Sequence, residues 1–300
     1  MLDQYQRKIE YLRLSITNRC QLHCPYCRGN QQEKAYHELS LLEIQKIVRV
    51  CLSLGIHKIR LTGGEPLLHP DIIEICKAIS TLEGLQELTL TTNAQNLLEY
   101  AKPLYDAGIH RINISLDSLQ AEKYHRLTGG DLSAVLKGIE AAQKVGMHPI
   151  KINVVLLRNV NDDEIQDFLD FAKTKHVEVR FIELMPMGRL SKAPELRIPM
   201  DEVLKQCRAP KELLNSTEPA RHFTTANREE FSVIPPMTNP FCATCNRIRI
   251  LSDGIVKPCL GCDTEYSIRE ALQETDAVLK EQLTEIIFHK PKMHQMQKRK

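Results

Sequence analysis

Two groups of three cysteines have the spacing of metal ligands. The first group stands within eight residues and consists of Cys20, Cys24 and Cys27. The second group is more spread out and consists of Cys242, Cys245 and Cys259. Three thiolates fall one short of the four ligands that close a cubane iron-sulfur cluster or a tetrahedral zinc site. A position left open can bind a reactant, so the first group in particular favours a catalytic metal site over a structural one.

Zinc is the alternative metal for both groups. His23 lies inside the first group and could complete a tetrahedral zinc site there. Cys262 follows Cys259 in a CxxC pair, so the second group could be a closed four-cysteine zinc site. Spacing alone leaves these alternatives open. The remaining cysteines lie in helical patterns, and we expect them to be packing thiols: Cys51, Cys76 and Cys207.

The composition is that of a globular protein with reduced thiols. The chain has 300 residues, 42% of them hydrophobic and 26% charged, and a formal net charge of +2. This balance predicts a sizeable core and argues against a duplex nucleic-acid binder or a membrane-surface protein. Residues 1–16 lack the apolar region of a signal peptide, and no stretch is long enough to cross a bilayer. The chain has ten cysteines, and we therefore expect a cytoplasmic protein in which they serve metal binding rather than a disulfide framework, apart from those that pack in the core.

Six short apolar runs alternate with amphipathic helical patterns in the first part of the chain. The predicted strands are 11–17, 58–62, 88–92, 111–116, 150–157 and 177–184. The clearest helix is 40–54, where Ser40 and Glu43 form a capping box and Gly55 follows. The alternation predicts an α/β fold with a parallel sheet, either open and doubly wound or closed into a complete or partial barrel. The first cysteine group follows the first strand, at the carboxyl end where active sites of such folds form.

A proline-rich stretch after Met185 marks a change of organisation. We place a barrel region at 1–200 and a C-terminal region, which carries the second cysteine group, at 201–300. The last eleven residues contain five Lys or Arg and no acid, which predicts a solvated tail.

The first cysteine group, with Tyr26 just before its last cysteine, resembles the cluster loop of the radical S-adenosylmethionine superfamily. Further motifs follow in the order typical of that superfamily, at 62–66, 91–93 and 113–117. The resemblance implies a [4Fe-4S] cluster whose open iron binds S-adenosylmethionine, and a 5′-deoxyadenosyl radical that abstracts a substrate hydrogen. Without the cysteines, Gly63 and Gly64 would indicate only a tight turn.

The second cysteine group resembles the corresponding segment of the GTP 3′,8-cyclase family, which acts in molybdenum cofactor biosynthesis. The matching residues are 240–249, 252–254 and 258–260, and the resemblance extends to 13–17, 151–155, 160–164 and 179–186. It implies an incomplete six-fold, TIM-like βα barrel whose C-terminal region carries a second [4Fe-4S] cluster. In this interpretation Cys262 is a bystander.

The same resemblance implies that the chain converts GTP to (8S)-3′,8-cyclo-7,8-dihydroguanosine 5′-triphosphate. It assigns S-adenosylmethionine to Tyr26, Gly64, Ser115 and Met185. It assigns GTP to Arg13, Arg60, Thr91, Lys151, Arg247 and Arg249. Arginine suits this role because its forked donors match phosphate oxygens. Strand alternation also puts Arg247 and Arg249 on one face of a short strand beside the second cysteine group.

Several features go beyond this assignment or depart from it. The family implies an electron donor and a downstream cyclic pyranopterin synthase, allows a homodimer, and implies no stable nucleic-acid or membrane partner. The family usually ends in a Gly-Gly tail, whereas this chain ends at 297–300 in a basic segment, and residues 28–30 also differ. Ala94 stands where glycine is common.

The alternatives are a sister radical enzyme that acts on another nucleotide or a peptide, and a non-catalytic zinc-binding protein.

Overall fold

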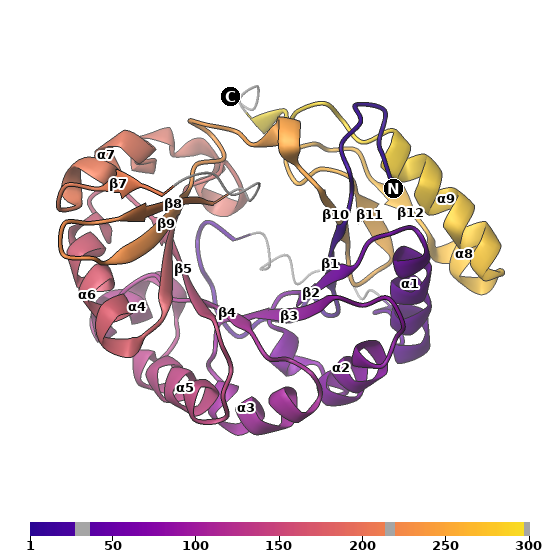
Figure 1. Ribbon diagram of the computed structural model, residues 1–300, viewed down its shortest axis with the longest axis horizontal. Helices are drawn as coiled ribbons and strands as arrows, with labels where there is room; N and C mark the ends of the chain where they lie inside the picture. The colour runs from indigo at the N-terminus through magenta and orange to yellow at the C-terminus, as the bar shows by residue number, and fades with distance from the viewer. Residues whose placement is uncertain (28–36, 214–219, 297–300) are drawn as a thin grey trace.

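Six parallel strands form the centre of the fold (Figure 1). The structure is a computed structural model, and it describes residues 1–27, 37–213 and 220–296. The strands are β1 (Tyr11–Ser15), β2 (Lys58–Thr62), β3 (Glu87–Thr92), β4 (Ile112–Ser115), β5 (Ile150–Leu156) and β6 (Glu178–Glu183). They pair in chain order, and every pair is parallel. The six predicted strands are confirmed, each within two residues of its expected bounds.

Helices cover the outside of this curved sheet (Figure 1). The longer ones are α1 (Leu41–Ser53), α2 (Ile72–Ser80), α3 (Leu97–Asp106), α4 (Ala121–Thr128), α5 (Leu132–Lys144) and α6 (Ile165–Lys175). The short 3-10 helices are η1 (Pro66–Leu68), η2 (Asp162–Glu164), η3 (Gly188–Lys192) and η4 (Pro194–Leu196). The predicted capping box of α1 is present, with the Ser40 N–H donating to the Glu43 carboxylate at 2.8 Å. Within the described residues, no helix is both long enough and apolar enough for a bilayer crossing.

The C-terminal region extends both edges of the six-stranded sheet. Its elements are α7 (Met200–Gln206), β7 (Lys211–Glu212), β8 (Arg221–Thr224), β9 (Glu230–Ile234), η5 (Cys242–Thr244), β10 (Arg247–Ile250), β11 (Ile255–Lys257), β12 (Tyr266–Ser267), α8 (Arg269–Gln273) and α9 (Asp276–Phe288). Strand β9 pairs with β6 and β10 pairs with β1, both in parallel. The partial barrel with a C-terminal region is therefore confirmed. Strands from before and after residue 200 belong to one sheet, and a domain boundary at that residue stays a prediction.

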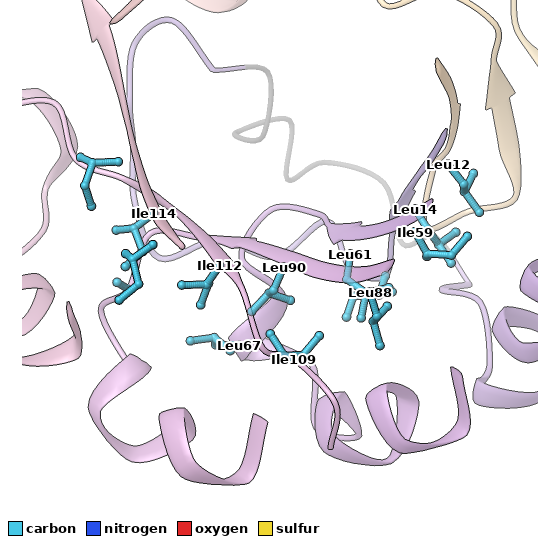
Figure 2. Close-up of a cluster of buried hydrophobic side chains, with 14 of the residues drawn as sticks. Leu12, Leu14, Ile59, Leu61, Leu67, Leu88, Leu90, Ile109, Ile112 and Ile114 are labelled. Atoms are coloured by element: carbon cyan, nitrogen blue, oxygen red, sulfur yellow. The ribbon is translucent and has the colours of Figure 1, made fainter. Parts of the chain in front are cut away.

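Aliphatic side chains on the outer face of the sheet form the core. Figure 2 shows a cluster that points from the strands toward the helices: Leu12, Leu14, Ile59, Leu61, Leu88, Leu90, Ile112 and Ile114. All of these side chains are buried. Because successive residues of a strand point to opposite faces, the residues between them must line the inner face.

The inner face is polar where it follows the first three strands. Strand register places Arg249 level with Arg13, Arg13 level with Arg60, and Arg60 level with Thr89. A complete TIM barrel fills this space with branched apolar side chains. The cationic row here instead indicates a surface that receives a polar, anionic ligand.

Arg7 joins both ends of the chain to the segment that carries the second cysteine group. Its guanidinium donates to the Asp3 carboxylate at 2.6 Å and to the carbonyl oxygens of Cys242 at 2.9 Å and Pro291 at 2.8 Å. Asp3 is 1% exposed and Arg7 is 8% exposed. This ion pair is therefore buried, and its cation also satisfies backbone carbonyls from two distant segments.

Replacing Arg7 by methionine should lower the free energy of unfolding of the apo-protein by about 3–5 kcal/mol, because Asp3 would remain buried without its partner. Urea titration measures this loss. The control is Arg49→Met, which breaks the exposed Arg49–Asp276 pair and should cost less than about 1 kcal/mol. Equally small losses in both variants would show that the buried pair does not hold the termini in place.

Candidate functional site

The first cysteine group occupies the loop after β1. Cys20 and Cys24 are half-buried and Cys27 is exposed. The Leu22 N–H donates to the Cys20 sulfur at 3.4 Å. Burial raises the pKa of Cys20, and it raises the pKa of Cys24 to about 12; the charges of neighbouring cysteines add to both shifts. The three sulfurs therefore lie close enough together to repel one another as thiolates, a repulsion that a bound cationic group would offset.

The three cysteines of this loop supply one ligand fewer than the four irons of a cubane cluster. Within 1–27, 37–213 and 220–296, no three His, Cys, Asp or Glu side chains meet closely enough to hold a single metal ion. A cubane places each thiolate on a different iron, so its ligands stand further apart than those of one zinc ion. The group fits a [4Fe-4S] cluster with one iron left open.

Gly63 and Gly64 let two backbone segments run side by side next to Cys20. A Cβ on Gly64 would lie 2.2 Å from the carbonyl oxygen of Arg19, and one on Gly63 would lie 2.5 Å from that of Thr17. The Gly64 N–H donates to the Thr17 carbonyl at 2.8 Å. Neither glycine has a positive φ. Close approach to the cysteine loop, and not an unusual turn, therefore explains both glycines.

The Glu65 carboxylate ties the loops after β2 and β3 together. It is 1% exposed and accepts hydrogen bonds from the Leu67 N–H at 3.1 Å, the Thr92 hydroxyl at 2.5 Å and the Asn93 N–H at 2.7 Å. Asn93 in turn places its side-chain amide 3.9 Å from the Cys20 sulfur. Burial raises the pKa of Glu65 to about 7 in spite of these bonds. Glu65 had no predicted role, although a carboxylate directly after two adjacent glycines was a signal in the sequence.

Asp117 is a second buried carboxylate, and it ends the 113–117 motif without a predicted role. It accepts a hydrogen bond from the Tyr26 hydroxyl and another from the Val155 N–H at 2.8 Å. Burial raises the pKa of Asp117 to about 6 and raises the pKa of Tyr26 well above its usual range. The Tyr26 phenol is thus engaged within the protein, which leaves its ring and backbone to contact a ligand.

The residues predicted to bind S-adenosylmethionine gather around the first cysteine group. Gly64, Ser115 and Met185 follow or end β2, β4 and β6, at the same edge of the sheet as the cysteine loop. The segment after β6 also covers that loop, because the Arg189 N–H donates to the Pro25 carbonyl at 2.9 Å. The structure therefore brings these four residues, Tyr26 included, to one edge.

Ala94 occupies a position whose backbone favours glycine. Its φ is +61°, in the left-handed region, and its side chain is fully buried. An alanine there costs about 1–2 kcal/mol relative to a relaxed backbone. Its N–H donates to the Thr92 hydroxyl at 2.9 Å, so the loop keeps its conformation with alanine. The other departures, at 28–30 and 297–300, lie outside the described residues.

Four of the residues predicted to bind GTP form a cationic cluster on the inner face: Arg13, Arg60, Arg247 and Arg249. Burial and the charges of neighbouring arginines lower the pKa of Arg13 to about 9 and that of Arg249 to about 9. Among the described residues, none of the four forms an ion pair with a carboxylate. The Nε atoms of Arg13 and Arg247 are buried without a hydrogen-bond partner. Uncompensated charges of this kind fit an anionic ligand.

Thr91 and Lys151 lie one row further along the inner face. Both are level with Asn113 of β4, whose Oδ1 atom is buried without a partner. The Lys151 ammonium is 2.8 Å from the Glu178 carboxylate, and burial lowers the pKa of Lys151. Lys151 is therefore already paired, unlike the four arginines, although it faces the same side of the sheet.

The second cysteine group lies at the opposite edge of the sheet from the first. Cys242 and Cys245 precede β10, and Cys259 follows the antiparallel β11, so all three stand at the amino end of β10 and β1. Burial alone would raise the pKa of Cys245, but Lys290 and the Arg247 N–H lower it. A lowered pKa favours the thiolate, which is the form that binds metal.

Cys262 differs from the other three cysteines of its segment. It is 2% exposed, and its thiol lies 3.7 Å from the Met293 carbonyl oxygen, to which it donates. Burial raises the pKa of Cys262 to about 11, and the neighbouring Cys259 adds to the rise. A buried thiol that donates to a backbone carbonyl fits the prediction of a bystander. Cys51, Cys76 and Cys207 are buried as expected of packing thiols.

The pKa of Glu65 predicts how acid affects the apo-protein. Its folded pKa of about 7 lies above the ordinary 4.5, so the proton stabilises the folded state. Relative to the Glu65→Gln variant, wild type should therefore gain up to about 3 kcal/mol in free energy of unfolding as the pH falls from 7.5 to 4.5. Urea titrations of both proteins across this range give the difference. A difference that does not change with pH would contradict the raised pKa.

Comparisons with known proteins agree with this geometry. Residues 14–172 match the Radical SAM superfamily, and residues 177–296 match Molybdenum Cofactor Synthesis C. The GTP 3′,8-cyclase of Alkaliphilus oremlandii (strain OhILAs) is 40% identical over 304 residues, which cover 99% of this chain and 95% of that protein. The GTP 3′,8-cyclase of Listeria monocytogenes serotype 4b (strain CLIP80459) is 39% identical over 309 residues, which cover 98% of this chain and 92% of that protein.

A solved structure shares the fold. Streptococcus suis SuiB bound to S-adenosylmethionine superposes with a TM-score of 0.66 at 18% identity, over 90% of this chain and 65% of that chain. The cofactors of the family are S-adenosylmethionine and two [4Fe-4S] clusters, and the two three-cysteine groups fit them. The near full-length identity and the two family matches show that this chain belongs to the GTP 3′,8-cyclase family of the radical S-adenosylmethionine superfamily.

Proposed function

We propose that this chain is the radical S-adenosylmethionine enzyme that converts GTP to (8S)-3′,8-cyclo-7,8-dihydroguanosine 5′-triphosphate in molybdenum cofactor biosynthesis. The observation that carries the proposal is the row of arginines, which have no carboxylate partner among residues 1–27, 37–213 and 220–296 and lie between two three-cysteine groups at opposite edges of one sheet. A peptide substrate would not need such an excess of fixed positive charge, whereas a nucleoside triphosphate does.

At the carboxyl edge, Cys20, Cys24 and Cys27 would hold the first [4Fe-4S] cluster. When bound there, the cluster and S-adenosylmethionine would supply an electron and a 5′-deoxyadenosyl radical able to remove a hydrogen atom from the ribose. The backbone at Gly64 and the side chains of Ser115 and Met185 would position the S-adenosylmethionine, together with the ring of Tyr26. The buried carboxylate of Asp117 would hold the cysteine loop in place through Tyr26, and that of Glu65 would hold the segment after β3 through Asn93.

On the inner face, Arg13, Arg60, Arg247 and Arg249 would bind the phosphates of GTP. Thr91 and Lys151, one row nearer the carboxyl edge, would bind the part of the nucleotide closest to S-adenosylmethionine. At the amino edge, Cys242, Cys245 and Cys259 would hold the second cluster. A nucleotide that spans these rows lies inside the curved sheet, where it is shielded from water and stray hydrogen donors.

The proposal extends to the surroundings of the enzyme. It includes a cytoplasmic location, an electron donor and a downstream cyclic pyranopterin synthase, and it allows a homodimer. It also keeps the division into a barrel region at 1–200 and a C-terminal region at 201–300.

The test of the proposed function is anaerobic reconstitution with iron, sulfide and reductant, followed by incubation with S-adenosylmethionine and GTP. Mass spectrometry should detect 5′-deoxyadenosine together with the cyclised nucleotide. Formation of 5′-deoxyadenosine that does not depend on GTP would exclude GTP as the substrate and leave the radical chemistry intact. A colourless protein that retains zinc would exclude the radical chemistry as well.

Arg247→Ala and Arg249→Ala should each weaken GTP binding at least about tenfold, because each removes a charged donor from a poorly solvated site. Isothermal titration of the reconstituted protein measures the affinity. Arg126→Ala, at an exposed position of α4, is the control and should bind GTP as wild type does. Unchanged affinity in both inner-face variants would remove them from the GTP site.

The ligand assignment at the second group predicts opposite results for two neighbouring cysteines. Cys259→Ala should lose about four irons per chain, because a ligand is missing, whereas Cys262→Ala should keep a full complement. Iron and sulfide analysis of the anaerobically reconstituted variants gives the count. Loss of the same number of irons from both variants would make Cys262 a ligand.

A further inference from the structure

Tyr11 lies inside the cationic cluster and has no assigned role. It begins β1 and is level with Arg247 of β10. The Cζ atom of Arg60 is 5.2 Å from the centre of the Tyr11 ring, and that of Arg247 is 5.7 Å from it. Tyr11 shares the inner face with Arg13 because the two residues are two positions apart in one strand. Its ring therefore packs between two cations at the amino end of the row.

The Tyr11 hydroxyl is buried without a hydrogen-bond partner. The whole residue is 9% exposed. Buried hydroxyls normally have a partner, and an unpaired one costs stability, so the atom calls for an explanation. The Nε atoms of Arg13 and Arg247 have the same unpaired state in the same cluster. Three polar groups that face one region and lack partners together indicate a missing acceptor there.

The missing acceptor must be anionic. The Tyr11 hydroxyl can donate, and both Nε–H groups can only donate. Four guanidinium groups share this row of the inner face, and within the part of the chain that the structure describes none of them pairs with a carboxylate. The neutral base of a nucleotide would leave this charge uncompensated, whereas phosphate oxygens would both accept the hydrogen bonds and offset the charge.

We infer that the Tyr11 hydroxyl is a phosphate-binding donor, which contacts the phosphate chain of the nucleotide while Arg60 and Arg247 hold its ring in place. This inference rests on the proposed function for the identity of the nucleotide, but the phosphate contact itself does not depend on guanine. The role is one of substrate binding, and it makes Tyr11 a residue that distinguishes a triphosphate from an unphosphorylated nucleoside.

Tyr11→Phe is the informative substitution, because it removes the hydroxyl and keeps the ring between the two arginines. The reconstituted variant should bind GTP and inorganic tripolyphosphate about tenfold more weakly than wild type, with unchanged affinity for guanosine. Tyr5→Phe is a matched control: Tyr5 also contacts an arginine, with the Cζ atom of Arg7 5.3 Å from its ring, but it is exposed. This control should leave all three affinities unchanged.

A second measurement separates binding from folding. Because the hydroxyl has no partner in the ligand-free protein, its removal should leave thermal stability and iron content at wild-type level or slightly above. A marked loss of stability in Tyr11→Phe would show that the hydroxyl serves the fold, and would overturn the inference.

The binding outcomes also distinguish the inference from the proposed function. Unchanged GTP and tripolyphosphate affinity in Tyr11→Phe overturns the phosphate contact and leaves the GTP assignment standing. Weakened guanosine binding alone moves the contact to the base and overturns it too. If wild type binds tripolyphosphate but shows no preference for GTP over ATP, the GTP assignment fails, while a tenfold loss for tripolyphosphate in the variant still supports the role of Tyr11.

Discussion

The parallel pairing of β10 with β1 fixes the position of the second cysteine group relative to the arginines of the inner face. It places Arg247 beside Tyr11 and Arg249 beside Arg13, and it continues from there to Arg60 through β2. Because side chains alternate along a strand, a slip of one residue would turn Arg247 and Arg249 to the outer, aliphatic face. The same slip would move the Cys245 loop relative to β1. The register of this single pair therefore determines both the cationic row and the position of the second cysteine group.

This arrangement divides stability and function between the two faces of the sheet. The outer face buries leucine and isoleucine against the helices, and this apolar area is the main source of stability. The inner face carries arginines that lower one another's pKa and lack carboxylate partners. Such charges oppose folding in the ligand-free protein, and a bound phosphate chain relieves them. The fold thus tolerates the repulsion between the arginines of the inner face because its apolar core lies on the outer face.

The loop of the first cysteine group is held in place by contacts with the segments that follow neighbouring strands. The loop is held by close-packed backbone at Gly63 and Gly64 and by two buried carboxylates, Glu65 and Asp117. Glu65 accepts hydrogen bonds from the segments after β2 and at the end of β3, and Asp117 accepts them from Tyr26 and from Val155 of β5. Each carboxylate therefore fixes the relative position of segments that are distant in the chain. Burial raises the pKa of both groups in spite of the hydrogen bonds that they accept.

The sequence by itself determined the features that depend on local spacing. Two three-cysteine groups, six strands and the alternation of Arg247 and Arg249 could be predicted because ligand spacing and strand period extend over only a few residues. Only the tertiary structure decided what depends on pairing between remote segments. It put the two cysteine groups at opposite edges of the sheet, showed that Gly64 packs against Arg19, and placed Tyr11 between two arginines. Strand register and close backbone approach join residues far apart in the chain, and no local pattern encodes them.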